Sequence, residues 1–229
     1  SMNWRISNLD KFQLVSFSDA HSYWPFRLGR EATIFDLKEL TYKNLIKAIR
    51  TGEGLISTIE TPPEYGKYHF TGHRNCNVLL NPEQSLKIKN VCPVCNQHLT
   101  VGVAERIEEL ADRPEGFIRE NAKQFVRLIP LHELISAVYG YTQLYSKKVW
   151  DIYNKLIAKF NFEFNILLDI SEEELKTIAD KKLVDIILLN REGKLKIKPG
   201  YDGVYGQIIL NKDEIKINNK KEQKSLEEF

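Results

Sequence analysis

Hydrophobic side chains at helical and strand spacing predict most of the regular structure of this 229-residue chain. Apolar residues recur every three or four positions across 141–160, which is the pattern of an amphipathic helix. A strand, Pro130 and a helix through Val138 are predicted before it, and a capping box at Ser171 opens a further helix. This last helix is expected to carry Leu175, Ile178, Leu183, Ile186 and Ile187.

Short strand and helix signals separated by turns fill the rest of the chain. Residues 12–18 alternate apolar and polar side chains and predict a strand. Residues 41–50 predict a helix that Thr41 caps and Gly52 ends. The other predicted elements are a short helix after Asn81, a strand after Cys95, a helix over 104–111 and two strands within 195–210.

Composition restricts the function classes only weakly. The chain carries 33 Lys and Arg against 31 Asp and Glu, so bulk charge neither favours nor excludes a nucleic-acid partner. Any basic surface must therefore be local. No apolar run approaches the roughly 20 residues that span a bilayer, so we expect a soluble, cytoplasmic protein without a membrane partner.

The three cysteines lie close together and predict a metal site. His73-x-x-Cys76 is followed by Cys92-x-x-Cys95, two knuckles that can each present two ligands to one tetrahedral ion, as in a zinc ribbon. Thiolates with one imidazole suit zinc, and four protein ligands leave no open position for a substrate. We therefore expect a structural zinc ion that holds together a small module without a core of its own.

Alternatives to this ligand set remain open at the level of sequence. His69 and His98 flank the knuckles, and either could replace His73. Three buried free thiols are a further alternative, against which the paired spacing argues. A disulfide is disfavoured because three cysteines are an odd number.

Asp19 and His21 follow the predicted strand directly. Side chains two apart on an extended segment point the same way, so one carboxylate and one imidazole could bind the same metal cluster or act on the same substrate. A solvated junction between strand and loop is the alternative. Arg106 and Arg113, on and after the helix that follows the cysteines, are candidates for phosphate contacts, although surface arginines are more often solvated or ion-paired.

Five collinear motifs resemble the endonuclease Q family of archaea and some bacteria: FSDAHS, GHRNC, CPVC, RIEELADRPEG and PGYDGVYG. The resemblance implies an N-terminal polymerase-and-histidinol-phosphatase (PHP) domain with a metal-dependent nuclease site, a zinc-binding module and a C-terminal α+β region. It also implies cleavage of double- or single-stranded DNA on the 5′ side of deaminated bases, such as uracil and hypoxanthine, and of abasic sites.

The resemblance assigns roles to particular residues. FSDAHS matches the last metal-binding motif of the PHP domain, so Asp19 and His21 are implied ligands of Mg, Mn or Zn. The earlier ligands have no counterpart here, and two ligands are too few for metal-activated hydrolysis, so we expect this chain alone to be inactive. Arg74, Arg106 and Arg113 are implied DNA contacts.

The final residues resemble a partner-binding peptide. Gln223, Leu226 and Phe229 match the Gln-x-x-Leu-x-x-aromatic pattern by which archaeal repair enzymes bind the sliding clamp. Spaced three apart, the three side chains would share one face of a helical turn. An ordinary disordered tail is the alternative.

We therefore expect an α+β chain with four parts: a piece of a PHP (β/α) barrel over 3–58, a zinc-binding module over 59–113, a C-terminal α+β domain over 114–210 and a tail over 211–229. The first functional hypothesis is part of a DNA-repair endonuclease. A DNA-binding or adaptor zinc protein without catalysis and a PHP-type phosphoesterase acting on small molecules are the two alternatives.

Overall fold

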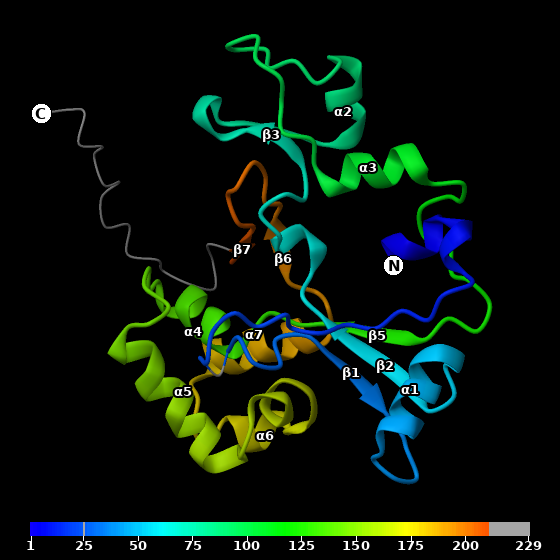
Figure 1. Cartoon of the computed structure of the whole chain (residues 1–229). Helices are drawn as coiled ribbons and strands as arrows, with labels where there is room; N and C mark the ends of the chain where they lie inside the picture. Colours follow the sequence, from blue (N-terminus) through cyan, green and yellow to red (C-terminus); the bar gives the residue numbers. More distant parts are fainter. Residues whose placement is uncertain (25, 211–229) are drawn as a thin grey trace, which may run out of the picture. The chain divides into compact units, whose positions relative to one another are not determined.

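The computed structural model describes residues 1–24 and 26–210, which form a mixed α+β protein with small sheets (Figure 1). This confirms the predicted α+β class. The chain divides into two compact units, the first built from residues 1–130 and 189–209 and the second mainly from 131–188. Within the described ranges, the helices are all too short or too polar to cross a membrane.

The main sheet of the first unit has three strands in the order β1-β2-β5. Strand β1 (Ala32–Phe35) runs antiparallel to β2 (Leu55–Glu60), and β2 runs parallel to β5 (Gln124–Arg127). Leu55 and Ile59 bury the core face of the central strand. The strand predicted before Pro130 is thus confirmed as β5.

Helix α1 (Tyr42–Thr51) connects β1 to β2 and confirms its prediction. The Thr41 side chain accepts a hydrogen bond from the Asn44 N–H, as an N-cap does, and Gly52 ends the helix. Ala48 lies on its buried face.

The strand predicted over 12–18 is wrong. Both the N–H and the C=O of Ser16 bond to the side-chain hydroxyl of Thr33 on β1, at 2.9 and 2.8 Å. Because a side chain takes the place of the neighbouring backbone, no ladder forms and the segment stays irregular. Ser16 is the buried residue of this stretch, whereas Phe17 is exposed.

Two 3-10 turns at the start of the chain, η1 (Met2–Arg5) and η2 (Ser7–Leu9), lie against α3 and the residues that follow it. The contacts are charge-assisted, and two of them are bidentate ion pairs of the kind that Arg forms best. The pairs are Arg5 with Glu108, Ser7 with Asp112 and Asp10 with Arg113. Glu108, Asp112 and Arg113 of the RIEELADRPEG motif therefore bind this N-terminal segment.

The region around the cysteines contains a short hairpin and two helices (Figure 1). Strand β3 (Thr71–His73) pairs antiparallel with β4 (Val78–Leu80). Helix α2 (Pro82–Lys87) begins at Asn81 with a complete capping box, and α3 (Val103–Leu110) follows; both confirm predicted helices.

The strand predicted after Cys95 is wrong as a separate element. This segment makes one bridge between Val91 and His98 and another between Gly72 and Thr100. Because each bridge involves a different neighbour, neither extends into a ladder.

The two strands predicted within 195–210 are confirmed as the antiparallel pair β6 (Lys196–Lys198) and β7 (Gln207–Ile209). The loop between them packs on the 3-10 turn η3 (Pro63–Tyr65), where the Gly200 N–H donates to the Glu64 carbonyl at 2.9 Å. Residues almost 140 positions apart in sequence, Glu64 and Gly200, thus lie side by side.

The second unit is helical. Helices α4 (Leu131–Tyr139) and α5 (Lys147–Phe160) confirm the two predicted there. The apolar stripe of α5 is buried and consists of Val149, Tyr153, Leu156 and Phe160. A π-helical turn over Asn165–Asp169 follows.

The single helix predicted from Ser171 onward is wrong, because it is divided into α6 (Glu172–Leu175) and α7 (Lys181–Arg191). The Asp180 carboxylate accepts the Leu183 N–H at 3.0 Å and starts the second helix anew. The break leaves Ile178 exposed, although the other predicted apolar positions are buried: Leu175, Leu183, Ile186 and Ile187.

Candidate metal centre

The two predicted knuckles converge. The ligand atoms of His73, Cys76, Cys92 and Cys95 all lie within 4.8 Å of one another, and the Cys95 sulfur is 3.3 Å from the His73 Nδ1. In a tetrahedral zinc site with bonds of about 2.3 Å to sulfur, neighbouring ligand atoms lie about 3.8 Å apart. Three thiols and one imidazole at this spacing therefore fit a zinc ion, with only a small contraction of the set.

Local backbone features bring the ligands together. Each knuckle ends on an asparagine in the left-handed region, Asn77 at φ 51° after Cys76 and Asn96 at φ 58° after Cys95. Asparagine tolerates this conformation better than most residues, so the repeated Cys-Asn pair is a sequence signal for the two tight turns.

Gly72 lets the hairpin close beside the first knuckle. A Cβ at this position would lie 2.4 Å from the Val78 carbonyl oxygen and 2.5 Å from the Tyr201 ring. A larger residue here would push apart the strand that carries His73.

The module around the four ligands has a small core. Val78, Cys92 and Leu99 are its buried hydrophobic residues, with the other two cysteines packed against them. A core of this size provides little stability, so a bound ion would supply a large part of the folding free energy of the module.

Two of the thiols differ in acidity. Burial alone would raise the pKa of Cys92, but hydrogen bonds from the Cys95 and Val94 N–H groups and the His73 side chain lower it to about 6. Hydrogen bonding to Cys95, burial and a bond to Cys92 raise the pKa of Cys76 to about 11. The backbone therefore favours one thiolate, the form that binds metal.

The two alternative histidines lie outside this set of four ligands. His69 is buried and stacks on the Phe70 ring with the centroids 4.9 Å apart, and burial lowers its pKa. His98 is exposed and makes a backbone bridge.

Glu105 is a buried carboxylate that the sequence did not single out. It accepts hydrogen bonds from the Thr71 and Ser85 hydroxyls and from the Asn90 amide, and so ties α3 to β3, to α2 and to the loop after α2. Burial would raise its pKa, but these three donors hold the pKa below the ordinary value. Acidic residues are seldom fully buried, so neither spacing nor charge pattern distinguishes Glu105 from its exposed neighbours.

The PGYDGVYG loop lies against the first knuckle. The Asp202 carboxylate accepts the Arg74 N–H at 2.7 Å and the Thr100 hydroxyl at 2.6 Å. The Tyr201 hydroxyl donates to the Asn77 side chain at 2.9 Å. Asp202 and Tyr201 therefore hold the metal module from the far end of the sequence.

Asp19 and His21 line an open hollow of about 470 Å³, together with Arg27 and Tyr205 among others. Both are exposed, but the extended geometry predicted for them is wrong, because Asp19 has a φ of 44°. This turn brings the His21 Nδ1 within 2.7 Å of the Asp19 carbonyl oxygen. Among the described residues, neither joins a group of three or more metal-ligating side chains.

The three predicted DNA-contacting arginines differ in their surroundings. Arg74 is exposed on the first knuckle. Arg106 is exposed and pairs with Glu109, one turn along α3. Arg113 is engaged with the Asp10 carboxylate, and its guanidinium lies 4.5 Å from the Phe117 ring centroid. Gln223, Leu226 and Phe229, the predicted clamp-binding residues, lie outside the described residues.

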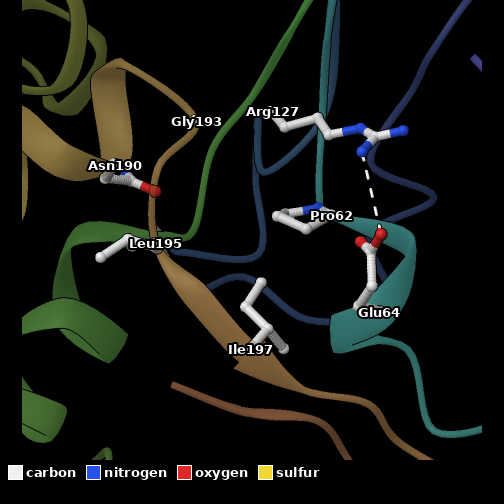
Figure 2. A pocket seen from close by; sticks show the side chains of 7 residues that line it. All are labelled: Pro62, Glu64, Arg127, Asn190, Gly193, Leu195 and Ile197. Atoms are coloured by element: carbon white, nitrogen blue, oxygen red, sulfur yellow. Dashed lines mark ion pairs between the residues drawn. The ribbon is translucent and has the colours of Figure 1, made fainter. Parts of the chain in front are cut away.

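A second cavity of about 280 Å³ lies between η3, β5 and the chain leading into β6 (Figure 2). Glu64 and Arg127 face each other across one end, with their nearest charged atoms 3.9 Å apart. Asn190 at the other end bonds to both backbone groups of Ile129. The side-chain amide of Asn190 is therefore engaged in holding the backbone at Ile129 within the first unit.

Comparisons with known proteins place the chain among a group of relatives. A family model described as the MJ0043 C-terminal domain matches residues 130–194. The protein MJ0043 of Methanocaldococcus jannaschii is 34% identical over 218 residues, 92% of this chain and 27% of that protein. The protein YqxK of Bacillus subtilis is 28% identical over 206 residues, 89% of this chain and 48% of that protein.

Two solved structures share the fold. The lesion-specific endonuclease PfuEndoQ from Pyrococcus furiosus has a TM-score of 0.83 at 32% identity, covering 95% of this chain and 54% of its own. Endonuclease Q in complex with a 27-mer duplex carrying an abasic lesion has a TM-score of 0.82 at 31% identity, over 94% of this chain and 54% of its own. The chain thus spans about half the length of these endonucleases, and over that span it resembles the endonuclease Q family in both sequence and fold.

Proposed function

We propose that this chain is the part of a lesion-specific DNA-repair endonuclease that carries a structural zinc ion and a DNA-binding surface. The observation that carries the proposal is the agreement in fold with endonuclease Q over 95% of the chain at 32% identity. Solved endonuclease Q has been captured with a duplex that carries an abasic lesion, which makes damaged DNA the expected partner.

The proposal assigns zinc to His73, Cys76, Cys92 and Cys95, in a ribbon-like module within 59–113. The convergence of four ligand atoms and the soft, thiolate-rich donor set support zinc over magnesium or calcium. All four ligands come from the protein, so the ion would stabilise the module and take no part in hydrolysis.

The proposal also assigns Asp19 and His21, within a PHP-derived segment 3–58, to a nuclease site for Mg, Mn or Zn. The His21 Nδ1 faces the Asp19 carbonyl oxygen, which leaves Nε2 as the ligand atom, and such a bond to the second nitrogen is typical of metal-binding histidines. A divalent metal there would activate water for attack on the phosphodiester 5′ of the lesion. Two ligands do not form a multinuclear site, so we expect no cleavage by this chain alone.

DNA contacts are proposed for the exposed arginines. Arg74 is exposed, and the ion pair of Arg106 with Glu109 is more exposed than that of Arg113 with Asp10, which suits phosphate contacts by the first two. Arg113 would have to release Asp10 first, so we expect it to contribute less. A C-terminal domain over 114–210 and clamp binding by the tail over 211–229 stay part of the proposal.

A gel experiment tests this function. End-labelled duplex with a single deoxyinosine, deoxyuridine or abasic site is mixed with the chain and Mg or Mn, and then resolved on a denaturing gel beside a gel shift. An undamaged duplex is the control for the substrate and His21→Ala the control for the site. We expect tighter binding to the lesion duplex and no incision.

Each other outcome is informative. Incision 5′ of the lesion that His21→Ala abolishes would support the endonuclease and overturn the claim that two ligands are too few. Equal binding to damaged and undamaged duplex would favour a DNA-binding or adaptor protein without lesion specificity. Failure to bind any duplex at low salt would contradict the proposal and favour a PHP-type phosphoesterase, to be tested on a small phosphate ester.

A further inference from the structure

Two exposed tyrosines and two cations gather where the segment 67–74 meets the loop 200–206. The Lys67 ammonium lies 5.4 Å from the Tyr68 ring centroid and 5.9 Å from the Tyr205 ring centroid. Tyr68 and Tyr205 keep 45% and 55% of their surface exposed. We call Lys67, Tyr68, Arg74 and Tyr205 the Tyr68–Tyr205 surface.

Gly203 lies next to both the Arg74 and the Tyr68 side chains of this surface. A Cβ at Gly203 would lie 3.4 Å from the Arg74 Nη1 and 4.0 Å from the Tyr68 hydroxyl oxygen. The Gly203 N–H donates to the Lys67 carbonyl at 2.9 Å, and its φ of 86° favours glycine. The backbones of the segment 67–74 and the loop 200–206 are therefore held side by side, with the Arg74 and Tyr68 side chains next to Gly203.

The hydrogen bonds around the Tyr68–Tyr205 surface leave its side chains available. Asp202 anchors the loop, and its carboxylate accepts hydrogen bonds from the Arg74 N–H and the Thr100 hydroxyl. The nearest cations, Lys67 and Arg74, form no ion pair within the described part of the chain. Tyr201 on the same loop is buried, in contrast to Tyr68 and Tyr205.

The surface adjoins the hollow that holds Asp19 and His21. Tyr205 is one of the residues that line this hollow, and Arg27 lies in its wall as well. Glu31 also lines it, but its carboxylate already accepts from the Ser16 hydroxyl and the Thr61 N–H. A row of cations and aromatic rings (Arg74, Tyr68, Lys67 and Tyr205) thus extends from the first knuckle to the hollow.

We propose that the Tyr68–Tyr205 surface binds single-stranded DNA by stacking unpaired bases on the two tyrosine rings while Lys67 and Arg74 contact the phosphates. Exposed aromatic rings beside cations are the features by which proteins hold unpaired strands, because every base has a face that can stack. Duplex DNA hides these faces, so the surface would engage a strand that has opened next to the hollow. The inference rests on the proposed function in taking DNA as the partner.

The test measures the anisotropy of a fluorescein-labelled single strand of mixed sequence as the full chain is added. Loss of one stacked base weakens binding about tenfold, so Tyr205→Ala should raise the dissociation constant by about this factor, and Tyr205→Phe should not. Lys67→Ala should reduce the slope of log affinity against log salt by about 0.7, because one phosphate contact is lost. Tyr42→Ala and Lys43→Ala, which remove an exposed tyrosine and lysine at the start of α1, are the matched controls and should bind like the wild type.

The outcomes separate this inference from the proposed function. The inference is overturned if Tyr205→Ala and Lys67→Ala bind the single strand as tightly as the controls. If the wild type still prefers the lesion duplex in that case, the proposed function stands without this surface. If the wild type binds neither the single strand nor the duplex at low salt, both are overturned. Zinc content and circular dichroism confirm that each variant is folded.

Discussion

Glu105→Gln replaces a buried, charged acceptor with a neutral amide of the same shape. At present one carboxylate oxygen accepts from two hydroxyls, of Thr71 and Ser85, and the other accepts from the Asn90 amide. The NH₂ group of the glutamine must take the position of one of the two carboxylate oxygens. Opposite Asn90 it would set two donors against each other, and opposite the hydroxyls it would force both of them to turn.

The cost follows from these contacts. Each bond to the charged carboxylate loses about 1 kcal/mol when its acceptor becomes neutral, and one buried pairing left unmade costs a further 1 to 3 kcal/mol. With two bonds weakened and the third left unmade, we therefore expect Glu105→Gln to lower the free energy of unfolding of the first unit by about 3 to 5 kcal/mol. Glu109→Gln makes the same exchange at an exposed ion pair on the same helix and should cost at most about 0.5 kcal/mol.

Urea denaturation of the zinc-loaded chain, followed by far-UV circular dichroism, measures both variants. The folded-state pKa of Glu105 lies below its ordinary value, so its contribution is present above that value and is lost as the pH falls through the folded-state pKa. The difference between wild type and Glu105→Gln should therefore shrink in acid. Equal stability of the two glutamine variants at neutral pH would refute the account of Glu105 as the buried tie of the module.

Three further perturbations test other parts of the structure. Cys92→Ser should lose bound zinc, measured by elemental analysis of the purified chain, whereas His98→Ala should retain it; zinc loss from both would place His98 among the ligands. Asp202→Ala removes two hydrogen bonds and should cost about 1 to 3 kcal/mol, and it should speed hydrogen exchange at the Arg74 N–H; unchanged exchange there would contradict the docking of the loop. Leu156→Ala in the second unit should cost about 2 to 5 kcal/mol in thermal or urea unfolding because the side chain is fully buried, and a loss no larger than that of exposed Lys155→Ala would contradict the assigned face of α5.

Local signals in the sequence predicted the elements whose causes are local. The caps at Thr41, Asn81 and Ser171 each start a helix, and the apolar stripe predicted within 141–160 includes three residues that α5 buries, Val149, Leu156 and Phe160. The x-x spacing of the knuckles predicted that the cysteines converge, because such spacing sets the geometry of each pair of ligands within one turn.

Features that depend on distant residues could not be read in this way. The alternation over 12–18 is real, but the Thr33 hydroxyl takes the place of a strand partner. Asp180 resembles any other polar residue in a helical stretch until its carboxylate is seen to cap α7. Glu105 and Asp202 act through partners up to 128 positions away, and no pattern along the chain marks such pairs.

The ion pairs that hold the first ten residues have a consequence for the order of folding. Arg5, Ser7 and Asp10 bind partners 103 to 105 positions later in the sequence. At about 5 to 20 residues per second, a ribosome needs roughly 5 to 20 s to supply these partners. During that time Arg5, Ser7 and Asp10 lack these partners. The N-terminal segment therefore docks after α1, β2 and the β3–β4 hairpin have been synthesised, whereas Ser16, closer to Asp19 and His21, can bind Thr33 of β1 much sooner.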